Sequence, residues 1–303
     1  MFGTTLEANL EFRKTMEYKI LTGNFKIPVI GLGTFKIGGS STEPDFSEDK
    51  ESIQAIKDAI ALWYSHIDTA ELYGATHTEE LIGEAIKDFE RSKLIITSKV
   101  YKTHLHYDDV ITSCKKSLER LQTAYIDIYL IHAPNPEIPL QETMEALDFL
   151  LEQGFIKHIG VSNFSVEQMK EAQKYSKYKI AVNQIPYNLS ARNEDYKGGG
   201  CSDMESEIIP YCQENDILVM AYRPIERGFL LQSHPLLDTL SVKYGKTKAQ
   251  IAIQRLISKK NIVTICKATQ TAHIKENLGA MWWTLDNEDI EALDATQFGT
   301  PNT

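Results

Sequence analysis

Short runs of apolar, mostly β-branched residues recur along the chain at intervals that leave room for a helix between them. The eight runs that we predict as strands lie at 29–32, 66–68, 94–97, 127–131, 158–161, 180–183, 217–220 and 262–265. The segments between them carry apolar residues three or four positions apart, as at Ile53, Ile56 and Ile60, which is the spacing of one helix face. Strand and helix therefore alternate, and strands that are apolar throughout indicate a parallel sheet buried on both faces.

Eight parallel strands are the number that closes a barrel, so we predict an α/β fold with a single parallel (β/α)8 TIM barrel. A doubly wound open sheet shows the same alternation and stays an alternative. Its support is weaker, because residues 31–36 read Gly-Leu-Gly-Thr-Phe-Lys and lack the third glycine of the dinucleotide fingerprint.

The segments Tyr18–Leu21 and Phe25–Ile27 flank Thr22-Gly23-Asn24 and predict an N-terminal β-hairpin ahead of the barrel. We expect residues 16–303 to form the barrel domain and residues 1–15 to be a poorly ordered N-terminal extension. Two longer polar stretches, 188–203 and 223–233, follow the sixth and seventh predicted strands. Loops of that length are often functional lids or mobile segments, and the simpler interpretation of Gly198-Gly199-Gly200 is slack rather than phosphate binding.

Composition narrows the class of partner. The formal net charge of −10 and a pI near 5.4 argue against nucleic acid or an anionic membrane as the main partner. The first 16 residues lack the unbroken apolar run of a signal peptide, and no window approaches the roughly 18 apolar residues of a membrane span. The four cysteines are scattered, which favours a reducing compartment. We therefore expect a cytoplasmic protein that acts on a small molecule.

Polar residues that carry chemistry follow three consecutive predicted strands. The second strand ends at Asp68 with Tyr73 in the next loop, the third leads to Lys99 and the fourth leads to His132. In an α/β barrel the carboxyl ends of the strands line one mouth, so these four side chains are predicted to converge there. Singly, each fits a helix cap, packing or a surface position, but four compatible groups are harder to explain in that way.

The four groups suit the reduction of a carbonyl by hydride transfer, which builds negative charge on the carbonyl oxygen. We expect Tyr73 to be the proton donor, with its pKa lowered by the ammonium of Lys99. Asp68 would keep Lys99 charged and oriented, and His132 would hold and polarise the carbonyl oxygen. The hydride must come from a cofactor, since no side chain carries one.

Four segments in this order resemble the signature segments of the aldo-keto reductases. They are His-Ile-Asp-Thr-Ala-Glu-Leu-Tyr-Gly at 66–74, Ile-Thr-Ser-Lys-Val at 96–100, Tyr-Leu-Ile-His at 129–132 and Gly-Val-Ser-Asn-Phe at 160–164. The resemblance covers about residues 25–277. It implies a (β/α)8 barrel whose base is plugged by the hairpin, and NADPH bound in an extended form without a Rossmann fold.

The resemblance also implies a set of cofactor contacts. These are Gly33, Thr34, Asp68, Ser162, Asn163, Gln184, Tyr222, Arg223, Ile225, Lys267, His273, Glu276 and Asn277. Within the set, Ser162, Asn163 and Gln184 match residues that hold the nicotinamide carboxamide, and Tyr222 matches the aromatic residue that stacks on the nicotinamide ring. Arg223 stands at a position where serine is the commonest residue of the family. It either reaches the pyrophosphate or pairs with a nearby acid.

Lys267 matches a ligand of the 2′-phosphate of NADPH. Ala268 and His273 replace a serine and an arginine of the same site, so a weaker preference for NADPH, with NADH as a second cofactor, is expected. Phe35, Tyr101 and His132 are the expected substrate contacts for a small aldehyde or ketone.

Two other classes of function stay open. The first is a metal-dependent hydrolase built from His66, Asp68, His104, His106 and His132, although Lys99 and Tyr73 have no role in it. The spacing of His104 and His106 alone is a weak metal signal, and we predict no metal site. The second is a cofactor-binding regulatory subunit with weak turnover, because a fold does not settle a function.

Overall fold

The computed structural model describes residues 17–21, 25–192 and 203–299. The expected extension at 1–15, the turn at Thr22-Gly23-Asn24 and the triple glycine lie outside these described residues. The division of the chain at residue 15 therefore stays a prediction.

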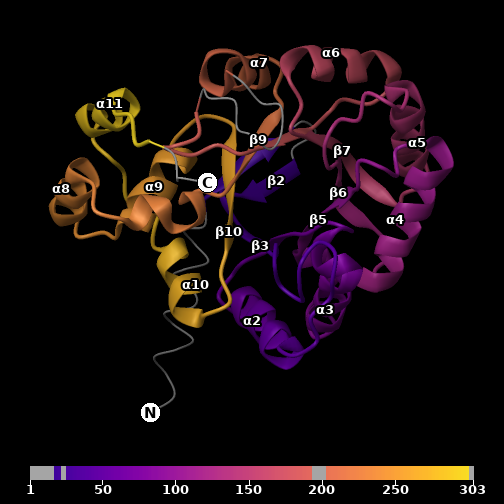
Figure 1. The fold of residues 1–303 in the computed structure, drawn as a ribbon, viewed down its shortest axis with the longest axis horizontal. Coiled ribbons are helices and arrows are strands. Elements are labelled where there is room, and N and C mark those ends of the chain that lie inside the picture. Colours follow the sequence, from indigo (N-terminus) through magenta and orange to yellow (C-terminus); the bar gives the residue numbers. More distant parts are fainter. Residues whose placement is uncertain (1–16, 22–24, 193–202, 300–303) are drawn as a thin grey trace.

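Eight parallel strands form a closed barrel, which confirms the predicted fold and makes the open sheet wrong. The strands are β3 (Ile30–Gly33), β4 (His66–Asp68), β5 (Ile95–Val100), β6 (Ile126–Ile131), β7 (Ile156–Ser162), β8 (Val182–Ile185), β9 (Leu218–Tyr222) and β10 (Ile262–Lys267). Neighbours in sequence are neighbours in the barrel, and β10 pairs with both β9 and β3 to close it. Figure 1 shows the strands in the middle of the molecule with helices around them.

The helices alternate with the strands as the spacing of apolar residues predicts. They are α2 (Asp49–Ala61), α3 (His77–Ile86), α4 (Tyr107–Leu121), α5 (Leu140–Glu152), α6 (Val166–Tyr175), α7 (Ile209–Glu214), α8 (Pro235–Tyr244), α9 (Lys248–Ile257), α10 (Thr271–Leu278) and α11 (Asn287–Ala295). Helix α2 buries Ile56, Ala59 and Ile60 toward the barrel. Two helices begin with a capping box, Ser165 with Gln168 in α6 and Thr247 with Gln250 in α9.

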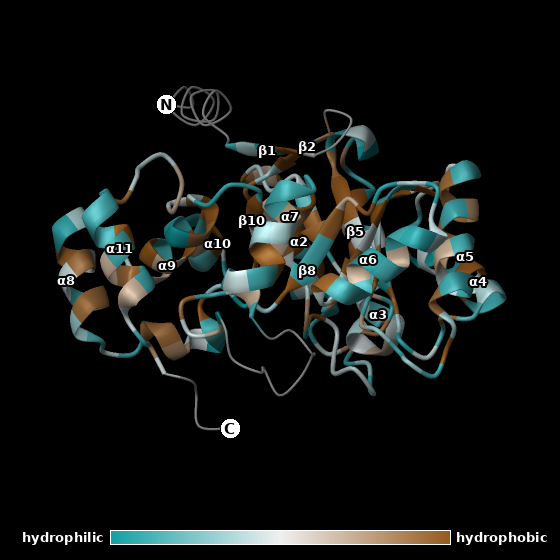
Figure 2. Ribbon diagram, turned by 90° about the horizontal axis from the view of Figure 1, so that it is seen from above, coloured by the Kyte–Doolittle hydropathy of each residue, from teal (hydrophilic) through white to brown (hydrophobic). Residues whose placement is uncertain are grey.

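The expected hairpin is present as β1 (Tyr18–Leu21) and β2 (Phe25–Pro28), paired antiparallel. Ile27 of β2 is completely buried in one apolar cluster with strand residues that include Ile128 and Val263. Figure 2 shows both hairpin strands at one end of the barrel. The hairpin therefore covers the base, and the carboxyl ends of the strands form the opposite mouth.

The stretch after β9 differs from the irregular loop that we predicted at 223–233. It contains a short 3₁₀ helix, η5 (Glu226–Leu231), in which Leu230 is buried. Arg227 and Gly228 interrupt it with positive φ angles of 54° and 93°. The segment is only six residues long, which is too short to show the repeated apolar spacing that predicts a helix.

Candidate active site

Asp68 and Lys99 form a buried ion pair at the mouth of the barrel. Asp68 ends β4 and Lys99 lies near the end of the adjacent β5, so parallel pairing brings them together. Lys99 Nζ lies 3.0 Å and 2.9 Å from the two Asp68 carboxylate oxygens and donates to the Thr69 carbonyl at 2.7 Å. Burial raises the pKa of Asp68 and lowers the pKa of Lys99, and each charge opposes the shift of the other. The predicted pairing is thus present.

Tyr73 lies beside this pair, in a short 3₁₀ helix, η2 (Tyr73–Thr76), between β4 and α3. Lys99 Nζ lies 3.4 Å from the Tyr73 hydroxyl oxygen. Within this segment the backbone leaves the helical conformation and is left-handed at three consecutive residues, with φ of 56° at Gly74, 48° at Ala75 and 86° at Thr76. Such strain persists only where surrounding contacts fix it, and it is common at functional sites.

We expected the pKa of Tyr73 to be lowered, but in the structure it is raised. Burial raises the pKa of Tyr73 well above 10, and the charge of Asp68 raises it further, while Arg223 opposes the rise. The error comes from treating Lys99 as a lone cation, although its charge is matched by Asp68 at 2.9 Å. Tyr73 therefore keeps its proton throughout the neutral pH range.

His132 follows β6 and completes the group. Its backbone N–H donates to the Val100 carbonyl at 3.0 Å, and its ring centroid lies 5.8 Å from that of Tyr73. Burial, with the charge of Lys99 as a second cause, lowers the pKa of His132 to about 3. The imidazole is neutral at physiological pH, and its buried Nδ1 has no hydrogen-bond partner among the described residues. The four predicted catalytic side chains thus meet at one place.

A connected set of polar groups lies on the next strands around the mouth. Asn163 Nδ2 donates to Ser162 Oγ and to the His132 carbonyl, both at 3.1 Å. Ser162 Oγ donates to the Gln184 carbonyl at 3.0 Å, and Gln184 Nε2 donates to Asp68 Oδ1 at 2.7 Å. The side chains expected to hold a carboxamide are therefore buried, mutually bonded and continuous with the ion pair.

Tyr222, at the end of β9, joins the same network. Its hydroxyl donates to Asn163 Oδ1 at 2.9 Å, and the guanidinium carbon of Arg223 lies 5.4 Å from its ring centroid. On the other side, Thr34 Oγ1 donates to the Asp68 carbonyl at 2.8 Å. Gly33 is in register with both Asp68 and Lys267, so β3 places it between these two sites.

The residues expected at the adenosine end lie further out. Lys267 is exposed at the end of β10, whereas His273, Glu276 and Asn277 lie on α10. His273 Nδ1 lies 3.1 Å from Glu276 Oε2, and Asn277 is buried. Ile225 is partly buried against an apolar cluster of α8, α9 and α11. Apart from the contact between His273 and Glu276, these residues do not share side-chain hydrogen bonds with one another among the described contacts.

Aromatic rings form a rim beside the four catalytic side chains. The rings of Phe35 and Tyr73 lie 5.1 Å apart between centroids, and those of Tyr101 and His132 lie 6.3 Å apart. The two expected rim residues Phe35 and Tyr101 are thus near the reacting groups.

Sequence reasoning missed Glu71, which holds this rim. Its carboxylate accepts a hydrogen bond from the Tyr101 backbone N–H and lies 3.0 Å from His104 Nδ1, although the side chain is only 8% exposed. A glutamate in a loop is ordinarily a solvated residue, so only its position two residues before Tyr73 could have drawn attention to it.

The histidines of the hydrolase alternative have separate partners. His104 pairs with Glu71, His106 pairs with Glu142 at 2.9 Å, and His66 Nε2 lies 3.0 Å from Thr97 Oγ1. In the described ranges there is no group of three or more histidine, cysteine or acidic side chains that could hold a metal ion. The proposed five-residue ligand set is not assembled, so the hydrolase has no structural support.

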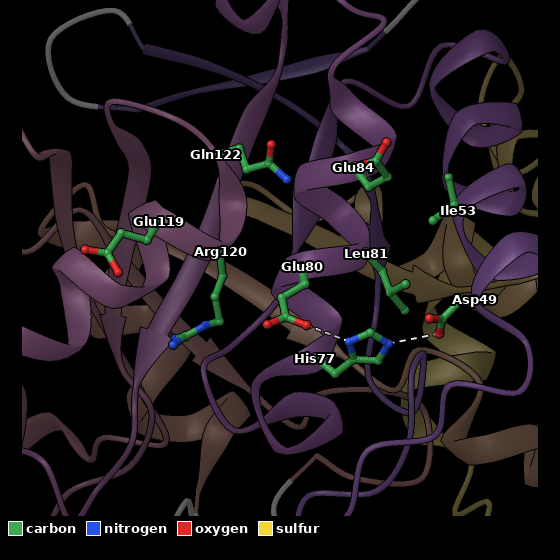
Figure 3. A pocket seen from close by; sticks show the side chains of 9 residues that line it. All are labelled: Asp49, Ile53, His77, Glu80, Leu81, Glu84, Glu119, Arg120 and Gln122. Atoms are coloured by element: carbon green, nitrogen blue, oxygen red, sulfur yellow. Dashed lines mark hydrogen bonds and ion pairs between the residues drawn. The ribbon is translucent and has the colours of Figure 1, made fainter.

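A hollow of about 550 Å³ lies away from this mouth, on the outside of the barrel between α2, α3 and α4. Figure 3 shows His77 there between Asp49 and Glu80. The His77 ring nitrogens lie 2.9 Å from the Asp49 carboxylate and 2.8 Å from that of Glu80. These contacts join the start of α2 to the start of α3, which follows η2 and Tyr73.

No described helix is both long and apolar enough to cross a membrane.

Comparison with known proteins agrees with this geometry. The aldo/keto reductase family model matches residues 29–297. Methylglyoxal reductase YeaE of Escherichia coli (strain K12) is 30% identical over 286 residues, which cover 92% of this chain and 95% of that protein. The glyoxal reductase of Bacillus subtilis (strain 168) is 33% identical over 277 residues, which cover 91% of each.

Solved structures of the same family have the same fold. The thermostable aldo-keto reductase Tm1743, in complex with the inhibitor epalrestat, has a TM-score of 0.85 and 43% identity, covering 92% of this chain and 99% of that one. The aldo/keto reductase of Klebsiella pneumoniae with NADP and acetate has a TM-score of 0.81 and 30% identity, covering 95% and 97%. The chain belongs to the aldo/keto reductase family and is an NAD(P)H-dependent oxidoreductase.

Proposed function

We propose that this protein reduces small aldehydes or ketones to alcohols with NADPH, using Tyr73 as the proton donor. The observation that carries the proposal is the meeting of four side chains, in which Lys99 Nζ lies 2.9 Å from Asp68 and 3.4 Å from the Tyr73 hydroxyl, with His132 beside them. The cofactor supplies the hydride. Tyr73, which stays protonated, gives its proton to the carbonyl oxygen.

The roles of the other three residues follow from their charge states. Asp68 balances the buried charge of Lys99, and Lys99 in turn holds the Tyr73 hydroxyl. His132 is neutral, so one ring nitrogen carries a proton that it can donate to the carbonyl oxygen without adding a charge. The aromatic rim of Phe35 and Tyr101 would exclude water from the reacting atoms.

The residues that line the mouth fit a nicotinamide cofactor. Ser162, Asn163 and Gln184 present amide and hydroxyl groups of the kind that bind a carboxamide, and Tyr222 offers an aromatic ring next to them. Gly33 and Thr34 would contact the nicotinamide end of the cofactor, and Arg223 and Ile225 are further cofactor contacts in this proposal. The exposed ammonium of Lys267, with His273, Glu276 and Asn277, would bind the adenosine and its 2′-phosphate, so NADPH is preferred and NADH is a second cofactor.

For the substrate we propose small carbonyl compounds, with 2-oxoaldehydes first among those to be tried. Two relatives are named for reductions of glyoxal and methylglyoxal.

The location of the protein in the cytosol stays a prediction.

The test is nucleotide oxidation, followed by absorbance at the reduced-nicotinamide band, with methylglyoxal, glyoxal and a panel of aromatic and aliphatic aldehydes. Oxidation that is faster with NADPH than with NADH and unaffected by a chelator supports the reductase. Tight cofactor binding with negligible turnover on every carbonyl compound would refute it and favour the regulatory subunit instead.

A further inference from the structure

The guanidinium of Arg223 lies against the ring of Tyr222, its neighbour in the chain. The distance from Cζ to the ring centroid is 5.4 Å, within the range in which a cation is attracted to an aromatic face. The Tyr222 hydroxyl is fixed by Asn163 Oδ1 at 2.9 Å, which limits the freedom of the ring. Arg223 therefore places a half-buried positive charge at the wall where we propose that the nicotinamide stacks.

The fold fixes the backbone that carries this charge. Arg223 has a left-handed φ of 59°, and left-handed angles recur at Glu226 and Arg227. Asn188 Nδ2 donates to the Arg223 carbonyl at 3.0 Å and to Glu226 Oε2 at 2.7 Å. Non-glycine residues hold such angles only where neighbouring contacts enforce them. The backbone position of Arg223 is therefore fixed by the surrounding fold.

The charge of Arg223 reaches the reacting groups. Arg223 is the cation that opposes the rise in the pKa of Tyr73, which burial and Asp68 cause. Lys99, a second cation near these groups, is paired with the carboxylate of Asp68 at 2.9 Å. Burial and the charge of Arg227 lower the pKa of Arg223, whereas Glu226 and Tyr73 raise it.

We propose that Arg223 makes the site discriminate between the two redox states of its cofactor, favouring the neutral reduced nicotinamide over the oxidised ring, which is cationic. The proposal rests on the function proposed above. In that reaction a hydride with its two electrons passes from NADPH to the carbonyl carbon, and the proton of Tyr73 passes to the oxygen. Loss of the hydride would leave a cationic nicotinamide in a site to which Arg223 contributes a positive charge.

The consequence is weaker retention of the spent cofactor. Repulsion from Arg223 weakens the binding of NADP⁺ and does not weaken the binding of NADPH. Replacement of the oxidised by the reduced cofactor is therefore favoured. An arginine that contacts only the phosphates would strengthen both forms equally, because the two forms carry the same phosphates. The ratio of the two dissociation constants separates these roles.

The experiment compares Arg223→Asn with Arg227→Asn by fluorescence titration with NADPH, NADP⁺, NADH and NAD⁺. Asparagine tolerates a left-handed backbone, and Arg227, with a φ of 54°, is exposed on the same loop, so the two variants remove one charge in a matched way. The Coulomb energy between two nearby unit charges, at an effective dielectric constant between that of a protein surface and that of water, corresponds to a change of about tenfold in a dissociation constant. We expect Arg223→Asn to lower the ratio of the NADP⁺ to the NADPH dissociation constant by about tenfold, and the NAD⁺ to NADH ratio similarly.

Arg223→Lys keeps the charge and is expected to keep most of the discrimination, and thermal unfolding checks that each variant is folded. If Arg223→Asn weakens both redox forms equally, or if Arg227→Asn changes the ratio as much, the inference is wrong while the reductase proposal stands. If the unaltered protein binds none of the four nucleotides, the proposed function itself is wrong and the inference fails with it.

Discussion

Replacing Lys99 by methionine tests the central ion pair without reference to any substrate. The change keeps a long side chain in the barrel but removes the ammonium that lies 3.0 Å and 2.9 Å from the Asp68 oxygens. Asp68 is 1% exposed, and among the described residues the side-chain donor that remains to it is Gln184 at 2.7 Å. The Thr69 carbonyl also loses the donor that Lys99 supplies at 2.7 Å.

The cost follows from leaving a buried charge without its partner. Breaking a buried ion pair by removing one member lowers the free energy of unfolding by about 3–5 kcal/mol. Burial raises the pKa of Asp68, and the coulombic effect of Lys99 is the largest of the opposing causes. Without Lys99 the folded pKa lies further above the unfolded value of about 3.9, so the loss is greatest at neutral pH. It shrinks as the pH falls through the raised pKa and the carboxyl group is protonated.

Urea unfolding at pH 7 and at pH 5 measures this loss. The matched control is the double variant with Asp68→Asn and Lys99→Met, which buries no charge and is expected to recover most of the stability at pH 7 while remaining inactive. If Lys99→Met unfolds at the same urea concentration as the unaltered protein at pH 7, or if the double variant is no more stable than the single one, the account of the pair is wrong.

Three further changes test the loop that carries Tyr73 and the helix after it. Tyr73→Phe is expected to lower the rate of carbonyl reduction by about 10²–10⁴-fold with an unchanged NADPH dissociation constant, and undiminished turnover would exclude Tyr73 as the acid. Gly74→Ala is expected to lower the free energy of unfolding by ~3 kcal/mol in a denaturant titration, because φ is 56° and the added Cβ would lie 2.6 Å from the Gly38 carbonyl oxygen. Burial alone lowers the pKa of His77, but hydrogen bonds with Glu80 and Asp49 outweigh it and the pKa is raised. The two hydrogen bonds of protonated His77 therefore stabilise the fold below the unfolded-state pKa of about 6.5, and this stabilisation is lost as the pH rises through the folded-state pKa. In urea unfolding, His77→Gln should accordingly differ from the unaltered protein more at pH 6 than at pH 9.

The barrel was predictable because its strands are buried on both faces, which produces apolar runs that hydropathy detects. The strand ends were less predictable. The third run was expected at 94–97, whereas β5 spans Ile95–Val100. Its last part contains Ser98 and Lys99, which are completely buried. Ser98 is satisfied by Glu79 at 2.5 Å, a partner 19 residues away that no local pattern reveals.

The identities of the catalytic candidates were predictable, but their charge states were not. Lys99 suggested a lowered pKa for Tyr73 when the two were considered as a pair. In the structure a third residue, Asp68, cancels that influence, and burial then decides the direction. Burial likewise decides the neutral state of His132. The desolvation of a group depends on every element packed around it. The sequence identifies the titratable groups, but it does not give the size of this effect on their pKa values.

These charge states determine which protonated form of the site is populated at neutral pH. Reduction needs groups that hold a proton at neutral pH and can donate it to an oxygen that becomes negative. Tyr73, with its raised pKa, and His132, neutral with one N–H, both meet that condition. Alcohol oxidation needs the opposite, a tyrosine that has already lost its proton, and burial beside Asp68 disfavours that phenolate. The protonated tyrosine that carbonyl reduction uses is therefore the form that burial favours at neutral pH, and the raised pKa makes its proton harder to release.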